Sequence, residues 1–281
     1  GITQPTISRS MQKLEAELGA PVFVRTRTHW TLTSVGEVYL EGARQAVAIQ
    51  RDIYARISDL ANHYGHMITI GLTSERGMQM FSAIYADIHE RYPDSVFQPV
   101  EATVEQQNRL LERGQLDIGF QTIGKRKYKT LHYETIMIEP FLLCVPNALA
   151  PAASGGLAGD DYPYVRLSDY KDQVFTLVKP SSTMRGMIDD LFLNAGFKPR
   201  LLFDSVGMRS MQKLAVHGQC CCIIPRFYAT PSDAVRYYRL SDGPSEWEMC
   251  AVWNEGRHMN RAARDFISIA AKYWQTHRYA E

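Results

Sequence analysis

No part of the 281-residue chain carries the run of about 18 apolar residues that a membrane-spanning helix needs. Its first residues also lack the basic and apolar regions of a secretory signal peptide. The sequence therefore predicts neither a membrane partner nor export. Because the chain opens with Gly1 inside a helical pattern, we expect it to be a piece from which N-terminal residues are missing.

The chain has little excess charge of either sign. It contains 31 basic and 30 acidic residues, which leaves a net charge of +1. Any nucleic-acid site must therefore be local, because the surface as a whole is not basic. With 45% hydrophobic and 22% charged residues, the composition is that of a folded protein, and the length predicts two or three domains.

Cysteine is scarce, and its arrangement excludes a disulfide framework or a zinc site. The five cysteines are an odd number, and none forms a Cys-x-x-Cys pair of the zinc-binding kind. We interpret Cys220–Cys222 as small apolar residues of a buried strand, with redox sensing as the alternative. This usage indicates a reducing compartment, so we expect the cytoplasm. The sequence also lacks a phosphate-binding loop, a nucleophile elbow and a zinc-protease helix, so we expect no enzyme, no catalytic residue, no metal and no cofactor.

The first segment predicts an amphipathic helix from Thr3 to Leu18. Thr3 can cap it, Pro5 fits its first turn, and Gly19 ends it. One apolar stripe runs along it, formed by Ile7, Met11, Leu14 and Leu18. The remaining surface carries amide, hydroxyl and guanidinium groups, which suit base edges and phosphates in a major groove. A merely solvated helix face is the alternative.

The next segment favours DNA binding. Two short apolar strands, Val22–Val24 and Trp30–Leu32, flank a basic turn, which is the layout of a wing beside a helix-turn-helix. We predict DNA contacts by Gln4, Pro5, Thr6, Ser8, Arg9, Lys13, Arg25 and Arg27.

At this point the sequence closely resembles the LysR-type transcriptional regulators. The resemblance is carried by QPTISRSMQKLEAELG at positions 4–19, by VFVR at 22–25 and by Leu32-Thr33-x-x-Gly36. It implies that residues 1–33 are a partial winged helix-turn-helix, with its first helix and most of its second helix missing. It also implies double-stranded operator DNA as a partner, and RNA polymerase as a possible one.

A long helix from Ser34 to Tyr64 is predicted next, opened by a capping box of Ser34 and Glu37. Its apolar positions repeat every 3.5 residues, a spacing that favours a partner helix. They are Tyr39, Ala43, Ala46, Gln50, Ile53, Ile57, Leu60 and Tyr64. We predict that residues 34–65 form a linker helix that dimerises through Ala46, Gln50, Ile53, Ile57 and Leu60, giving a homodimer or homotetramer. A helix packed on its own domain is the alternative.

Residues 66–281 alternate between strands and helices, which predicts an α/β effector domain of two lobes with largely parallel sheets. We expect lobe I to comprise 66–162 and 242–281 and lobe II to comprise 163–241, with the chain crossing near 163 and 241. The LysR resemblance implies the same fold, similar to periplasmic binding proteins.

Ligands of open α/β sheets bind beyond the carboxyl ends of the strands. Hydroxyl and amide side chains occupy such positions in both lobes, beside helix N-termini that favour anions. We therefore predict a small effector, most simply a carboxylate, held by Thr73, Ser74, Thr103, Gln121, Thr122, Ser181, Ser182 and Thr183. Each hydroxyl alone could be a plain helix cap. The alternative function is a solute-binding clamp without a DNA role.

Overall fold

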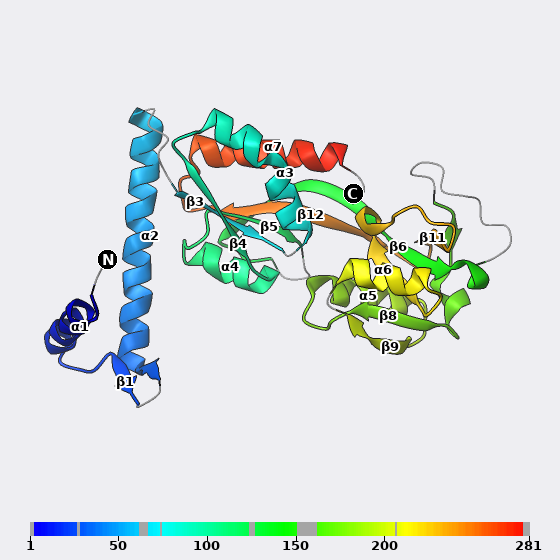
Figure 1. The fold of residues 1–281 in the computed structure, drawn as a ribbon, viewed down its shortest axis with the longest axis horizontal. Coiled ribbons are helices and arrows are strands. Elements are labelled where there is room, and N and C mark those ends of the chain that lie inside the picture. The colour runs from blue at the N-terminus through cyan, green and yellow to red at the C-terminus, as the bar shows by residue number, and fades with distance from the viewer. Residues whose placement is uncertain are drawn as a thin grey trace.

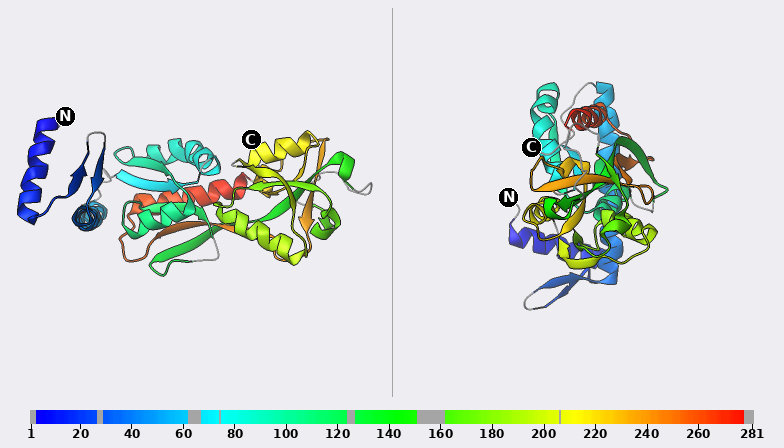
Figure 2. Two further views of the ribbon diagram at one scale, coloured as in Figure 1. Left: turned by 90° about the horizontal axis from the view of Figure 1, so that it is seen from below. Right: turned by 90° about the vertical axis from the view of Figure 1, so that its right-hand side faces the viewer.

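The computed structural model describes residues 3–26, 29–61, 67–73, 75–123, 127–150, 162–205 and 207–277. Figure 1 shows a short helix and a hairpin at one end, a long helix beside them, and a two-lobed α/β body. The lobes follow one another along the longest axis, with the long helix next to lobe I (Figure 2). The expected fold class is therefore confirmed.

Helix α1 (Gln4–Leu18) ends where the sequence predicts, because Gly19 adopts a left-handed conformation with φ of 68°. Thr3 occupies the N-cap position as expected, but its side chain makes no cap bond to the backbone: its hydroxyl lies 2.9 Å from the Thr6 hydroxyl instead. The carboxylate of Glu15 accepts hydrogen bonds from the backbone N–H groups of Val22 and Phe23, at 2.9 and 3.3 Å. These bonds fix the helix against the hairpin.

Strands β1 (Phe23–Arg25) and β2 (Trp30–Leu32) form the predicted antiparallel hairpin. The following helix, α2 (Ser34–Ala61), is capped by Thr33 and not by Ser34 as expected, since the Thr33 hydroxyl accepts the N–H of Gly36 at 3.0 Å. Thr33 also donates from its N–H to the carbonyl of Val22. At Gly36 a β-carbon would lie 2.1 Å from that carbonyl oxygen, so only glycine fits the junction.

One face of α2 packs on the effector domain. Asp52 accepts the backbone N–H of His258 at 2.6 Å, and Asp59 contacts the His258 ring at 2.8 Å and the N–H of Arg261 at 3.1 Å. Nearer its start, Glu41 pairs with Arg113. The alternative of a helix packed on its own domain is thus correct for this face.

Lobe I contains three parallel strands in the order β4-β3-β5. Its elements are β3 (Met67–Leu72), α3 (Arg76–Arg91), β4 (Val96–Glu101), α4 (Val104–Glu112) and β5 (Ile118–Thr122). The C-terminal helix α7 (Arg261–Thr276) lies beside α3, where Asp265 accepts the Tyr92 hydroxyl at 2.7 Å (Figure 1). Helices α3 and α7 cover one face of the sheet and α4 the other.

Lobe II repeats this arrangement, with parallel strands in the order β10-β8-β9. Its elements are β7 (Tyr164–Val165), β8 (Val174–Val178), α5 (Thr183–Asn194), β9 (Arg200–Ser205), α6 (Met208–Val216), β10 (Cys221–Pro225) and β11 (Val235–Leu240), with 3-10 turns at Asn147–Leu149, Leu167–Tyr170 and Arg226–Tyr228.

Strands β6 (Leu131–Pro146) and β12 (Glu246–Asn254) join the lobes. The first part of β6 pairs with β12, and the part from Phe141 onward pairs with β10 and β11. Strand pairing therefore places the first crossing at Pro140–Phe141 and not near 163 as expected, because one long strand serves both sheets. The second crossing lies between β11 and β12, near the expected position 241.

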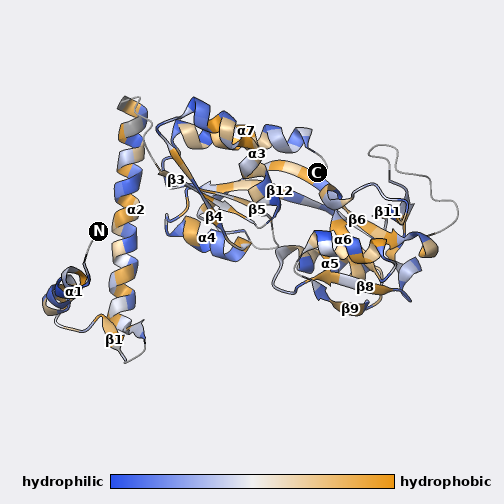
Figure 3. Ribbon diagram, in the orientation of Figure 1, coloured by the Kyte–Doolittle hydropathy of each residue, from blue (hydrophilic) through white to orange (hydrophobic). Residues whose placement is uncertain are grey.

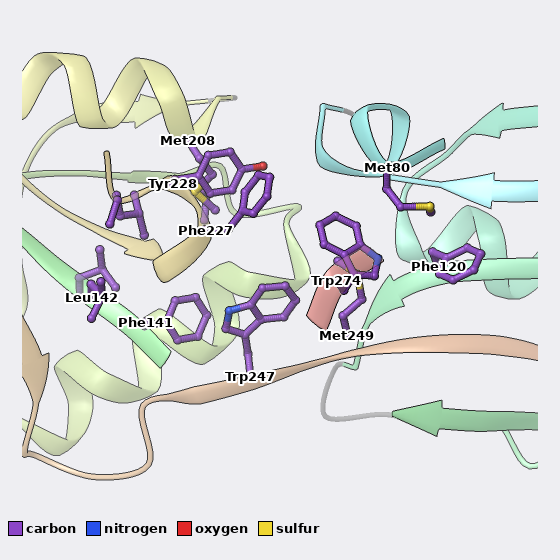
Figure 4. Packing of buried hydrophobic residues seen from close by; sticks show 14 of the residues in the cluster. Met80, Phe120, Phe141, Leu142, Met208, Phe227, Tyr228, Trp247, Met249 and Trp274 are labelled. Atoms are coloured by element: carbon purple, nitrogen blue, oxygen red, sulfur yellow. The ribbon is translucent and has the colours of Figure 1, made fainter. Parts of the chain in front are cut away.

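The hydrophobic core continues across this junction. Figure 4 shows Trp247 and Trp274 between Phe227 and Tyr228 on the lobe II side and Met80 on the lobe I side. The Phe227 and Trp274 ring centroids are 5.7 Å apart. The two lobes thus share a buried cluster of aromatic side chains.

Candidate functional site

The predicted DNA-binding side chains lie on the surface of α1. Gln4, Pro5, Thr6, Arg9 and Lys13 are exposed, whereas Ser8 is half-buried. Lys13 pairs loosely with Glu17, at 3.9 Å. Of the predicted wing residues, Arg27 and the side chain of Arg25 lie outside the described residues.

The apolar stripe of α1 is not buried as expected. Ile7 remains 49% exposed and Leu18 40% exposed, and α1 contains no buried residue. Met11 and Leu14 are half-buried, and the Glu15 hydrogen bonds to Val22 and Phe23 fix α1 beside the hairpin. The stripe is available for packing against a further segment.

The predicted dimer seam of α2 remains exposed in the single chain. Ile53 and Ile57 are 50% and 52% exposed, and Leu60 is 86% exposed, while Ala46 and Gln50 are also exposed. Apolar and polar stretches alternate along this helix (Figure 3). Because the contacts of Asp52 and Asp59 leave the side chains of the seam exposed, α2 can contact its own domain and a partner helix at the same time.

A cleft of about 520 Å³ lies between the two lobes. Six of the eight predicted effector residues line it: Thr73, Thr103 and Thr122 from lobe I, and Ser181, Ser182 and Thr183 from lobe II. The topology brings them together because each follows the carboxyl end of a parallel strand. Ser74 lies outside the described residues.

The hydroxyl groups of the cleft are not equivalent. Thr103 is an ordinary cap, since it accepts the N–H of Gln106 while the Gln106 side chain accepts the N–H of Thr103. Ser182 precedes α5 but makes no side-chain cap bond, and the first turn of α5 holds no acidic residue. The N-terminus of α5 therefore offers free donors to a ligand.

Gln121 is not a cleft residue. It is 1% exposed, and its amide donates to Asn108 of α4 at 2.8 Å. Successive residues of a strand point to opposite faces, so the exposure of Thr122 to the cleft requires Gln121 to face the helix layer.

Sequence patterns did not predict Arg76, a charged residue that lines the cleft although it is only 3% exposed. It forms a buried ion pair with Glu139 on β6, and Glu139 also accepts the N–H of Phe227 in lobe II at 3.1 Å. The guanidinium lies 4.2 Å from the ring centroid of Phe227 and 4.5 Å from that of Trp274. Arg76 therefore connects both lobes at the base of the cleft, through contacts that no local motif reveals.

Tyr228 and Trp247 add aromatic rings with polar tips to a lining that is rich in hydroxyl and charged side chains. Burial, and then the neighbouring carboxylate of Glu75, raises the pKa of the Tyr228 phenol well above its usual range. The hydroxyl therefore remains a hydrogen-bond donor at neutral pH.

The cysteines fit the apolar interpretation. All five are buried and free, and Cys222 lies opposite Cys144 in the pairing of β10 with β6. Burial raises the pKa of the Cys221 thiol to about 12, so the thiolate that oxidation needs is scarce. Within the described ranges no group of acidic, histidine or cysteine side chains could hold a metal, and no helix is long and apolar enough to cross a membrane.

A hairpin beside a helix, a long helix with exposed apolar side chains and a cleft between two lobes are the features expected of a ligand-responsive DNA-binding regulator. The family model described as the LysR substrate binding domain matches residues 61–275, and that of the bacterial regulatory helix-turn-helix protein, lysR family, matches residues 1–37. The chain belongs to the LysR family of DNA-binding transcriptional regulators, which are not enzymes. The match at 1–37 favours this class over a solute-binding clamp.

Curated relatives of similar sequence are also described as transcriptional regulators. The chain is 25% identical over 280 residues to the uncharacterized HTH-type transcriptional regulator YcgK of Bacillus subtilis, covering 96% of this chain and 86% of that protein. It is also 25% identical over 270 residues to the uncharacterized regulator YnfL of Escherichia coli, covering 94% and 88%.

Solved structures share the fold. Full-length OxyR from Pseudomonas aeruginosa matches with a TM-score of 0.68 at 18% identity, covering 96% of this chain and 87% of that one. CbnR, described as a LysR family transcriptional regulator, matches with a TM-score of 0.62 at 17% identity, covering 96% and 89%.

Proposed function

We propose that this regulator binds operator DNA through α1 and the wing, dimerises through α2, and changes its DNA affinity when a small carboxylate enters the interlobe cleft. The observation that carries the proposal is the convergence of Thr73 and Thr122 with Ser182 and Thr183 on one cleft from two lobes. A ligand that contacts both walls favours one arrangement of the lobes over others.

Two similar proteins support the separate parts of this proposal. CbnR has been solved in complex with its target DNA, with a TM-score of 0.56, 20% identity, and coverage of 96% of this chain and 90% of that one. The effector binding domain of QuiR has been solved in complex with shikimate, with a TM-score of 0.58, 14% identity, and coverage of 75% and 98%. Operator DNA also implies a cytoplasmic location. RNA polymerase is a proposed partner on the family assignment alone.

The route from cleft to DNA runs through lobe I and α2. Asp52 and Asp59 attach the linker helix to the segment that precedes α7, and Thr33 and Gly36 attach the same helix to the wing. Coupling of this kind is typically worth 1–3 kcal/mol between two binding sites.

The test is to select duplexes from a random pool with the protein, then screen small carboxylates by thermal shift. A ligand that raises the melting temperature is expected to change the Kd for the selected duplex about 5- to 150-fold. A ligand that binds but leaves DNA affinity unchanged contradicts the coupling.

A further inference from the structure

The two walls of the cleft carry opposite charge. Lobe I contributes the carboxylates of Glu75, Glu101 and Glu105, and lobe II contributes the ammonium of Lys179 beside the N-terminus of α5. Arg76, the remaining cation of the lining, is already neutralised by Glu139. A ligand that fills the cleft therefore meets a negative wall on one side and a positive wall on the other.

Most of these charges already have partners within the protein. Glu75 pairs with Arg209 of α6 at 2.9 Å, and Glu105 accepts the Tyr128 hydroxyl at 3.0 Å. Glu101, at the end of β4, and Lys179, directly after β8, have no ion pair or side-chain hydrogen bond to another described residue. The carboxylate of Glu101 on lobe I and the ammonium of Lys179 on lobe II thus remain available to a ligand.

The lining also holds buried donors that lack acceptors. Trp247 is 1% exposed and Arg76 is 3% exposed, and neither the indole N–H of Trp247 nor Nε of Arg76 has a hydrogen-bond partner in the described structure. Unsatisfied buried donors destabilise a protein until an acceptor reaches them. The start of α5 also has N–H groups free of a side-chain cap, which an acceptor such as a carboxylate on the ligand can reach.

A plain anion satisfies the lobe II wall but faces Glu101 across the cleft without compensation. Like charges repel, and the repulsion is stronger where water is excluded. A plain cation meets the reverse problem at Lys179 and the α5 N-terminus. We infer that the effector is a small zwitterion, such as an α-amino acid, whose carboxylate binds Lys179 and the α5 N-terminus and whose ammonium binds Glu101. This inference rests on the proposed cleft site and narrows its ligand class.

The first arm of the test is calorimetry of the protein with the proteinogenic α-amino acids, their N-acetyl derivatives and their carboxamides. The N-acetyl acid lacks the cation and the carboxamide lacks the anion, while both keep the side chain. We expect at least one amino acid to bind, and each blocked derivative of it to bind about ten- to a hundred-fold more weakly. The absence of binding across the whole panel overturns the inference.

The second arm uses Glu101→Gln, whose effect on affinity differs in sign between a zwitterion and a plain anion, together with Lys179→Met. Glu101→Gln is expected to weaken binding of the zwitterion about ten- to a hundred-fold, as is Lys179→Met, whereas Glu90→Gln on the exposed face of α3 leaves binding unchanged. For a plain anion, Glu101→Gln removes a repulsion and strengthens binding instead. An N-acetyl acid that binds as tightly as its parent, with affinity raised by Glu101→Gln, overturns the zwitterion but keeps the cleft site. Affinity unchanged by both substitutions and by Thr122→Val overturns the cleft site itself.

Discussion

The carboxylate of Asp52 on α2 accepts a 2.6 Å hydrogen bond from the backbone N–H of His258, which precedes α7. His258 lies two residues before Asn260, the N-cap of α7, and Arg56 pairs with the other oxygen of the Asp52 carboxylate at 2.8 Å. A side chain of the linker helix thus completes the backbone hydrogen bonding of lobe I. This contact attaches α2 directly to the backbone of the effector domain.

Stability should depend on the charge of Asp52. Burial alone would raise its pKa, but the His258 N–H and the Arg56 and Arg257 guanidinium groups outweigh burial and lower the pKa below 3.8. A depressed carboxyl pKa contributes stability above the unfolded pKa, and this contribution is lost as the pH falls through the folded pKa. At pH 7, Asp52→Asn should lower the free energy of unfolding by about 1 kcal/mol.

The measurement is urea unfolding of the parent and the variant at several pH values. The difference between them should shrink as the pH falls below 3.8. Asp172→Asn, at an exposed turn, serves as the control and should change little. A constant difference from pH 7 to pH 3 argues against an ionic role of Asp52.

Gly36 should tolerate no side chain. A β-carbon there would lie 2.1 Å from the Val22 carbonyl oxygen, so Gly36→Ala should destabilise the wing-linker junction by about 1–3 kcal/mol. Gly42 of the same helix has no atom within 4 Å of such a carbon, and Gly42→Ala should stabilise by up to about 1 kcal/mol. Thermal unfolding of both variants checks this pair; equal shifts would mean that the junction is not tight.

Local sequence patterns predict most helices and strands of this protein, whereas contacts between distant segments determine the features that these patterns do not predict. Helix α1 and strands β3 and β8 fall where periodicity, Gly19 and apolar runs place them. The cap of α2 is shifted by one residue, because Thr33 reaches the N–H of Gly36 while Ser34 is already helical.

In the cleft, too, some residues could be predicted from the sequence and others could not. Its hydroxyl residues follow strands and could be predicted, since strand ends converge in any parallel sheet. Gln121 looked equivalent to Thr122 but faces the other side, as strand alternation requires. Arg76 could not be predicted, because its partner Glu139 and the rings of Phe227 and Trp274 come from distant segments.

On the DNA side, Arg9 and Lys13 are expected to act differently. If Arg9 reads a base edge, Arg9→Ala should cost about 1–3 kcal/mol on the selected duplex and relax its sequence preference. Lys13→Ala should weaken all sequences alike and reduce the dependence of affinity on salt, as a lost phosphate contact does. Arg27→Ala in the wing should behave like Lys13→Ala. Fluorescence anisotropy at several salt concentrations separates these effects, and unchanged affinity in all three variants refutes the assignment of this surface.

The dimer seam can be tested at Ile57, which is 52% exposed in the single chain. Ile57→Asp would bury an unpaired charge from each partner, which costs several kcal/mol, so sedimentation should show monomers at concentrations where the parent dimerises. Gln45→Asp introduces the same charge at an exposed position outside the predicted seam and should leave the dimer intact. A variant at Ile57 that remains as dimeric as the parent argues for another interface.

The two walls of the cleft should contribute separately to effector binding. Thr122 ends β5 in lobe I, and Ser182 precedes α5 in lobe II with its hydroxyl free of a capping bond. Thr122→Val and Ser182→Ala should each remove a hydrogen bond to a charged group, worth about 1.5–3 kcal/mol or roughly ten- to a hundred-fold in affinity. Ser82→Ala on the exposed side of α3 removes only a bond to the Met78 carbonyl and should not change affinity. Calorimetry gives the effector Kd, and anisotropy without effector should show unchanged DNA affinity for all three variants, because none lies on α1 or the wing. If Thr122→Val and Ser182→Ala both bind the effector as tightly as the parent, then the effector occupies another site.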